Sequence, residues 1–189
     1  SESLVAEAPR RARLDGIDNV EFHAEPSGHS GKADDSCDLV VLHTLISHVA
    51  DPASVLAEAM RIARPSARIV IFDGDYASLT CHAGRPARDA AVVETLLEAI
   101  VANPHIMREI PGMLVDMGVS LEWAQADVLM EAGEAEFFAS LVGSYTPMAV
   151  RAGLLEASEA EDWLNHQRAA SESGRFYGSC NFVSYVARA

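Results

Sequence analysis

The chain has 189 residues and a mass of 20.3 kDa, the size of one domain or of a domain with an appended segment. Its 28 acidic residues outnumber its 14 lysines and arginines, giving a formal net charge of -14 and a pI of about 4.8. A surface this acidic repels nucleic-acid phosphates and anionic lipids. The composition therefore argues against nucleic acid and membranes as partners and favours a small molecule.

Compartment and metal content follow from the apolar runs and the cysteines. The longest apolar runs are far shorter than the roughly 20 residues of a membrane-spanning helix. Cys37, Cys81 and Cys180 lie far apart and form no CxxC pair, which suits a reducing compartment and argues against a zinc site. The chain does not open with a secretory signal pattern. We therefore expect a cytoplasmic protein without a metal.

The first half of the chain alternates helical and strand patterns. Amphipathic spacing predicts a helix over residues 3–14, and alternation predicts a strand over 19–25. A continuous apolar run over 37–42 is typical of a buried parallel strand. Asp51 and Pro52 have the chemistry of a helix N-cap and first position, and a second buried strand follows over 68–72. Strand, helix and strand predict one right-handed βαβ unit.

The second half is mainly helical until its last strand. Periodicity predicts helices over 87–102, 105–117, 134–144 and 156–173, and strands over 121–130 and 176–188. We expect Pro111 and Gly112 to break the second of these helices, and Ser158 with Glu161 to form a capping box on the last.

Three stretches carry a resemblance to a known family. They are NVEFHAEPSG, then DDSCDLVVLHTLISHVADPASVLAEAMRIARPSARIVIFDGDYASLT, and the tail SESGRFYGSCNFVSYVARA. They resemble the third to fifth and the last strands of class I S-adenosylmethionine-dependent methyltransferases, particularly the branch similar to ubiquinone and menaquinone biosynthesis enzymes. The resemblance implies an α/β, Rossmann-like sheet with S-adenosylmethionine as cofactor and S-adenosylhomocysteine as product.

The resemblance also divides the chain into parts. It implies a cofactor-binding core over 1–83, a helical lid or substrate cap over 84–120, and remaining core elements over 121–189. The family's first two strands and its glycine-rich turn have no counterpart in this sequence. In the family those strands lie between the third and fourth. We therefore expect residues 19–25 and 37–42 either to belong to a longer polypeptide or to pair in a smaller sheet, with a homodimer or an N-terminal segment as possible partner.

The cofactor-binding candidates follow the predicted strands, because ligands of open α/β sheets bind at the carboxyl ends of the strands. His43, Thr44 and His48 follow one strand. The resemblance adds the adenine-side residues Glu25, Pro26 and Ser27.

Catalytic and substrate candidates come from the next strand, the lid and the chain end. The catalytic candidates are His43, Asp75 and Tyr76, with His43 or Asp75 as the acid or base. Asp73 is an alternative to Asp75. The Asp-Gly-Asp sequence is also typical of an ordinary turn without a catalytic role. The substrate candidates are His82, Arg108, Tyr145 and Asn181. No HxH or HxxxH spacing supports a metal.

These observations favour methyl transfer to a small apolar or aromatic acceptor. Two alternatives stay open: a methyltransferase-like fold that now acts as a cyclase or isomerase, and a subunit that completes the sheet of a partner.

Overall fold

Residues 2–189, which the computed structural model describes, form one four-stranded mixed sheet and six helices. In chain order the elements are α1 (Glu2–Leu14), β1 (Cys37–His43), α2 (Pro52–Ile62), β2 (Ala63–His82), α3 (Pro86–Ile100), α4 (Ile106–Asp116), β3 (Ser120–Gly133), α5 (Phe137–Arg151), α6 (Ala157–Glu172) and β4 (Phe176–Arg188). The sheet order is β1-β2-β4-β3. β1 and β2 are parallel, and β4 runs antiparallel to both β2 and β3.

The predicted βαβ unit is confirmed by β1, α2 and β2. Asp51 caps α2, because its side chain accepts a hydrogen bond from the Ser54 backbone N–H at 3.1 Å, and Pro52 occupies the first helical position. Val40 and Leu42 point toward α2 and are buried, whereas Leu39 and Val41 are more than half exposed on the other face. The alternation of a strand thus sets which face of β1 is covered.

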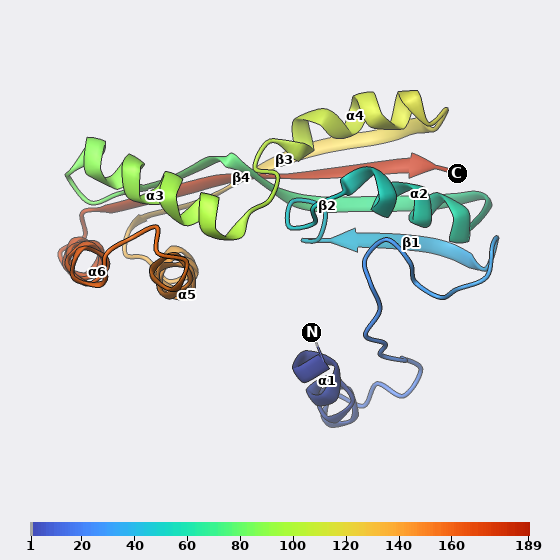
Figure 1. Ribbon diagram of the computed structural model, residues 1–189, viewed down its shortest axis with the longest axis horizontal. Coiled ribbons are helices and arrows are strands. Elements are labelled where there is room, and N and C mark those ends of the chain that lie inside the picture. Colours follow the sequence, from blue (N-terminus) through green and yellow to red (C-terminus); the bar gives the residue numbers. More distant parts are fainter. Residues whose placement is uncertain (1) are drawn as a thin grey trace.

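Two apolar cores hold the sheet and helices together. In the first, α2 and α4 cover one face of the sheet (Figure 1). In the second, α3, α5 and α6 gather around the far halves of β2 and β4, and Trp163 is fully buried there. The predicted lid segment 84–120 is divided between these cores: α3 packs in the second and α4 in the first.

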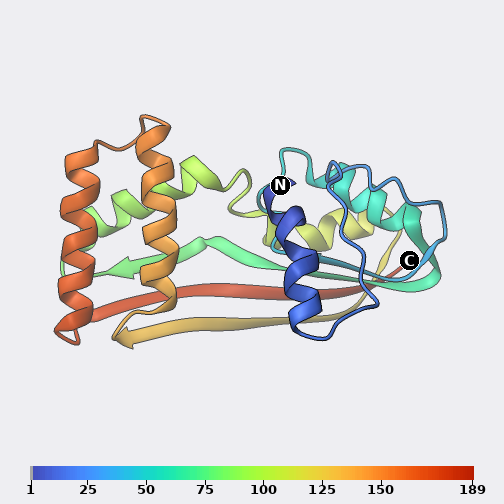
Figure 2. The same cartoon turned by 90° about the horizontal axis from the view of Figure 1, so that it is seen from below.

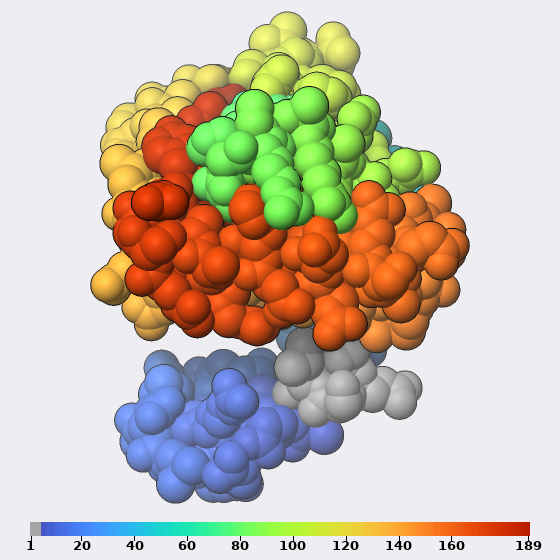
Figure 3. All heavy atoms as spheres, turned by 90° about the vertical axis from the view of Figure 1, so that its left-hand side faces the viewer, coloured from blue at the N-terminus to red at the C-terminus, as the bar shows by residue number. Residues whose placement is uncertain are grey.

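The strand predicted over residues 19–25 is wrong. This segment makes no sheet pairing, and Val20 and Phe22 are 41% and 37% exposed. Residues 19–25 therefore do not pair with β1 in a smaller sheet. Alternation makes a strand possible, but its backbone groups need a partner strand, and the described part of the chain provides none at that place. Figures 2 and 3 show residues 5–25, in blue, apart from the helices of the second core.

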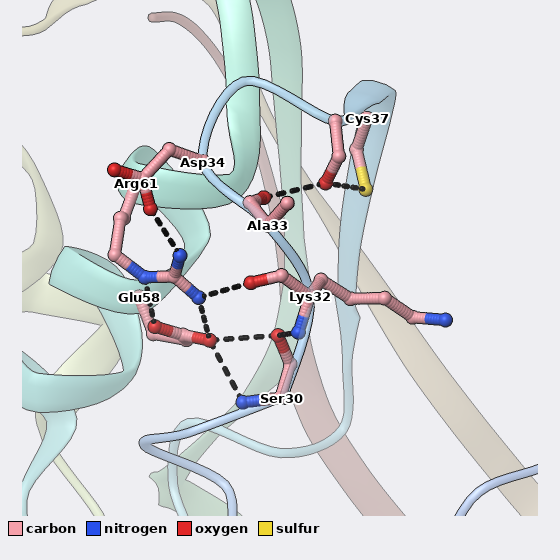
Figure 4. Close-up of polar contacts among 8 residues, drawn as sticks. Ser30, Lys32, Ala33, Asp34, Cys37, Glu58 and Arg61 are labelled. Carbon is pink, nitrogen blue, oxygen red and sulfur yellow. Dashed lines mark hydrogen bonds and ion pairs between the residues drawn. The ribbon is translucent and has the colours of Figure 1, made fainter.

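The segment before β1 is nevertheless anchored to α2 by a cluster around Glu58 (Figure 4). The Glu58 carboxylate accepts hydrogen bonds from the Ser30 N–H and hydroxyl, each at 2.7 Å, and from the Arg61 guanidinium at 2.8 Å. Arg61 also pairs with Asp34 and donates to the Lys32 carbonyl. Hydrogen bonds from Arg61 and then Ser30 hold the pKa of Glu58 far below its usual range.

Two predicted helix boundaries need correction. α4 continues through Pro111 instead of breaking there. Proline lacks the N–H that would bond to the Met107 carbonyl four residues earlier, and the Tyr185 hydroxyl donates to that carbonyl at 2.7 Å instead. The capping box on α6 is wrong, because Glu156 is the N-cap residue and Ser158 lies inside the first turn.

Candidate functional site

A pocket of about 490 Å³ lies where β1 ends and meets the middle of β2. Residues of β1, β2, β3, β4 and α5, and the first residue after β1, line it: His43, Thr44, Phe72, Tyr76, Asp127, Val128, Leu129, Phe137, Leu141, Cys180 and Phe182. This is the carboxyl edge of the parallel pair, the place where open α/β sheets bind ligands. The wall is mostly aromatic and aliphatic, so the pocket suits an apolar ligand.

The strand register brings the aromatic side chains of this pocket together. His43 and Phe72 are partners in the β1–β2 pairing, and their ring centroids lie 4.8 Å apart. Phe182 pairs with Gly74, which lies two residues after Phe72 on β2. The Phe72 and Phe182 rings are stacked, with their centroids 5.6 Å apart. Phe137, from the start of α5, contacts Phe182 edge-on at 6.4 Å. The result is a continuous aromatic surface beside His43.

His43 and Thr44 form the polar end of the pocket. The His43 ring is exposed, and its Nδ1 lies 3.2 Å from the Thr44 hydroxyl oxygen. Thr44 has φ of 45°, in the left-handed region that few non-glycine residues adopt, and its N–H donates to the Phe72 carbonyl at 2.8 Å. The chain therefore turns sharply at Thr44 and leaves His43 facing the pocket.

Two other polar side chains of the pocket stay protonated near neutral pH. Burial raises the pKa of the Cys180 thiol to about 11. Burial is also the main cause that raises the pKa of Tyr76, and the Tyr145 and Asp73 side chains raise it further. Asp127, at the edge of the pocket, accepts two hydrogen bonds from the Gln125 amide at 2.9 and 2.8 Å. Cys180 and Tyr76 can therefore donate hydrogen bonds inside the pocket.

The structure brings three of the predicted site residues, His43, Thr44 and Tyr76, into this pocket. Asp75 and Arg108 instead pair with each other. The Arg108 Nε donates to both Asp75 oxygens at 3.0 and 3.1 Å, and Nη2 donates at 2.9 Å. This fork joins α4 to β2.

The remaining predicted residues lie around the pocket or away from it. His48 packs edge-on against the Tyr76 ring at 5.5 Å, with its Nδ1 3.2 Å from the Ile100 carbonyl. The backbone N–H of Asn181 donates to the Ser78 hydroxyl. Tyr145 lies on α5 close enough to influence the pKa of Tyr76. His82 lines a separate groove of about 910 Å³ between β2 and α3.

The adenine-side candidates Glu25, Pro26 and Ser27 are exposed and do not line the pocket. The turn that follows them is close to α2, because a Cβ at Gly28 would overlap the Ser54 hydroxyl oxygen.

Sequence reasoning missed most of the aromatic wall. Phe72, Phe137, Phe182 and Cys180 were not among the predicted site residues, although the structure places all of them in the pocket. The available signal was the pairing of the last strand: a strand beside β2 puts its aromatic residues at the same sheet edge.

Two further properties concern the described residues alone. None of the helices within residues 2–189 is both long and apolar enough to cross a membrane. Over the same residues, no three or more histidine, cysteine, aspartate or glutamate side chains gather in a way that could hold a metal ion.

Comparison with known proteins places this geometry in a family. Residues 1–134 match the family described as "Methyltransferase domain". The chain is 30% identical, over 191 aligned residues, to an uncharacterised 37.1 kDa protein in transposon TN4556 of Streptomyces fradiae; the match covers 100% of this chain and 53% of that protein. The chain thus spans about half the length of the curated relative that it matches.

Solved structures share the fold. A candidate methyltransferase from Bacillus halodurans superposes with a TM-score of 0.65 at 16% identity, covering 100% of this chain and 79% of that one. A geranyl diphosphate methyltransferase in complex with S-adenosylmethionine superposes with a TM-score of 0.54 at 18% identity, covering 100% and 65%. The chain therefore belongs to the methyltransferase domain family. This family has the class I methyltransferase fold, and its cofactor is S-adenosylmethionine.

Proposed function

We propose that the protein transfers a methyl group from S-adenosylmethionine to a small apolar or aromatic acceptor held in the pocket beside His43. The observation that carries this proposal is the aromatic cavity at the carboxyl edge of β1 and β2. An aromatic wall without lysine or arginine favours an uncharged, planar or hydrocarbon-like acceptor.

The chemistry of the pocket fits the reacting end of the cofactor. A sulfonium is a cation, and the faces of Phe72 and Tyr76 attract cations through their ring quadrupoles. When bound, the cofactor supplies an electrophilic methyl group. His43 and Thr44 would hold it at the end of β1, and the net charge of -14 also favours a positively charged ligand.

The residues of the chain would then act mainly by alignment. The aromatic wall excludes water and holds the acceptor flat, which orients its nucleophilic atom. His43 would accept the proton of the acceptor hydroxyl that receives the methyl group. Tyr76 and Cys180, being protonated, would donate hydrogen bonds rather than act as bases.

The run from Asp38 to Asp75 supports a finer assignment, to enzymes similar to the ubiquinone and menaquinone biosynthesis methyltransferases.

A second candidate function rests on the outer edge of β1. This edge has no strand partner within residues 2–189, and Leu39 and Val41 beside it are 55% and 53% exposed. Apolar edges of this kind pair readily with another strand. The protein would then work as a subunit whose sheet is completed by a second copy or by an N-terminal segment.

The test is calorimetric titration of the 189-residue protein with S-adenosylhomocysteine, followed by transfer of a tritiated methyl group to a panel of small phenols. We expect His43→Ala to lose transfer and to weaken binding of S-adenosylhomocysteine, and Phe182→Ala to weaken binding of the acceptor. His166→Gln, on α6, is the matched histidine control. A folded protein that neither binds the product nor transfers methyl overturns the proposal, and native mass spectrometry then tests the subunit function.

A further inference from the structure

Asp73 is a fully buried carboxylate directly behind the pocket. Its Oδ2 accepts hydrogen bonds from the Ser47 N–H at 3.0 Å and from the Ser47 hydroxyl at 2.9 Å, and its Oδ1 accepts from the Gly74 N–H at 2.8 Å. The Asp73 side chain therefore ties the loop after β1 to the middle of β2. Hydrogen bonds to a charged acceptor are stronger than those between neutral groups.

The loop that Asp73 holds is the one that carries the polar end of the pocket. It spans residues 44–51, begins at the left-handed Thr44, and contains Ser47, which is also fully buried. Besides the Asp73 contacts, the loop is bonded to β2 through the Thr44 N–H. Loops are ordinarily more mobile than the elements they connect, so these contacts fix where His43 and Thr44 lie.

The same loop is held from its other side by the connection between α3 and α4. The Asn103 N–H donates to the Ser47 carbonyl at 2.9 Å, and its side-chain amide donates to the Val49 carbonyl at 2.6 Å. Ser47 thus has its N–H, carbonyl and hydroxyl all bonded. His48 adds a contact to the Ile100 carbonyl at 3.2 Å while its ring packs on Tyr76.

We propose that Asp73 and Asn103 are positioning residues for the pocket. They act through Ser47 to set the distance between Tyr76 and the end of the pocket formed by His43 and Thr44. Through Asn103, that distance also depends on the position of the α3–α4 connection. The proposal rests on the proposed function for its catalytic meaning, but its structural part stands on the contacts alone.

The chemistry of the site explains why an aspartate is needed there. Three donors face the two carboxylate oxygens, and at least one backbone N–H lies on each oxygen. An asparagine would point its NH₂ group at one of these N–H donors in either orientation. Such an unpaired buried donor is costly, so Asp73→Asn is expected to loosen the loop.

The experiment compares Ser47→Ala, Asn103→Ala and Asp73→Asn with Thr146→Ala. Thr146 is the matched control, because its buried hydroxyl donates to the Val142 carbonyl within α5 and lies outside the pocket. Two quantities are measured for each variant: amide hydrogen exchange at Thr44, and the dissociation constant for S-adenosylhomocysteine.

We expect faster exchange at Thr44 and about five-fold weaker binding in the three loop variants, the effect of about one net hydrogen bond. Thr146→Ala should lower the melting temperature without changing either quantity. Unchanged Thr44 exchange in folded Ser47→Ala and Asn103→Ala overturns the inference. If the unmodified protein does not bind S-adenosylhomocysteine, the proposed function fails, and the exchange measurement alone decides the inference.

Discussion

The contacts of Asp89 predict that its replacement by asparagine destabilises the whole second core. This buried carboxylate accepts four hydrogen bonds. Two come from the backbone N–H groups of Ala83 and Arg85, at 3.0 and 3.1 Å, and two from the side chains of Trp163 and Gln167, at 3.0 and 2.8 Å. It therefore closes the turn between β2 and α3 and joins that turn to α6.

The size of the effect follows from which donors asparagine can still satisfy. If its oxygen keeps the two backbone N–H groups, its NH₂ faces the indole N–H of Trp163, which cannot become an acceptor. Gln167 can turn its amide, since its own oxygen has no hydrogen-bond partner among the residues that the structure describes. One unpaired donor plus weaker bonds to a neutral acceptor should cost about 3 kcal/mol. For a chain of this length, that corresponds to a melting temperature lower by roughly 6–12 °C.

The assay is thermal and urea unfolding followed by the fluorescence of Trp163 in a Trp123→Phe background, because Trp123 is the exposed tryptophan. Asp162→Asn is the control: it removes an exposed carboxylate that pairs with Arg85 and Arg88 near the same turn. Exposed pairs contribute little, so the control should shift the melting temperature by less than about 3 °C. Equal losses in the two variants would show that the hydrogen bonds of Asp89 do not stabilise this core.

Three further predictions concern packing, acid stability and thiol reactivity. Gly178→Ala should destabilise the protein by about 1–3 kcal/mol, because the added Cβ would lie 2.7 Å from a phenylalanine ring; Gly112→Ala, with free space in a helix, should be neutral or stabilising in the same urea titration. Burial raises the pKa of Glu131, but three backbone N–H donors outweigh it and lower the pKa overall. The stability that Glu131 contributes is therefore present above pH 4.5 and lost as the pH falls through its lower folded value, so Glu131→Gln should flatten acid unfolding below pH 4.5. Iodoacetamide at pH 8 should label the half-buried Cys37 before Cys180, whose pKa is about 11; equal rates by mass spectrometry would contradict this.

How much of the fold the sequence predicts depends on how local each signal is. The unit of β1, α2 and β2 and the Asp51 cap were predicted, because apolar periodicity and capping chemistry act over a few residues. The failed strand over 19–25 has a clear alternating pattern, but a pattern does not supply a partner strand. Likewise, Pro111 was expected to break α4, and only the distant Tyr185 hydroxyl explains why the helix can continue.

The candidate site shows the same difference between local sequence signals and long-range contacts. His43, Thr44 and Tyr76 were predicted from a general rule about the carboxyl ends of parallel strands, and they do line one pocket. Phe137 and Phe182 reach that pocket only because β4 inserts between β2 and β3 and α5 packs beneath it, which no short pattern encodes.

Three acidic side chains share a role that the sequence motif alone left ambiguous. Asp73 on β2, Asp89 on α3 and Glu131 on β3 each accept hydrogen bonds from backbone N–H groups of a loop, a turn or the start of a helix. Such N–H groups have no partner in a regular sheet or helix, so a carboxylate there replaces water. Asp73 and Asp75 are accordingly bonded to Ser47 and Arg108, and neither of them lines the aromatic pocket. A highly acidic chain can therefore form an apolar site, because several of its carboxylates organise the backbone around that site instead of lining it.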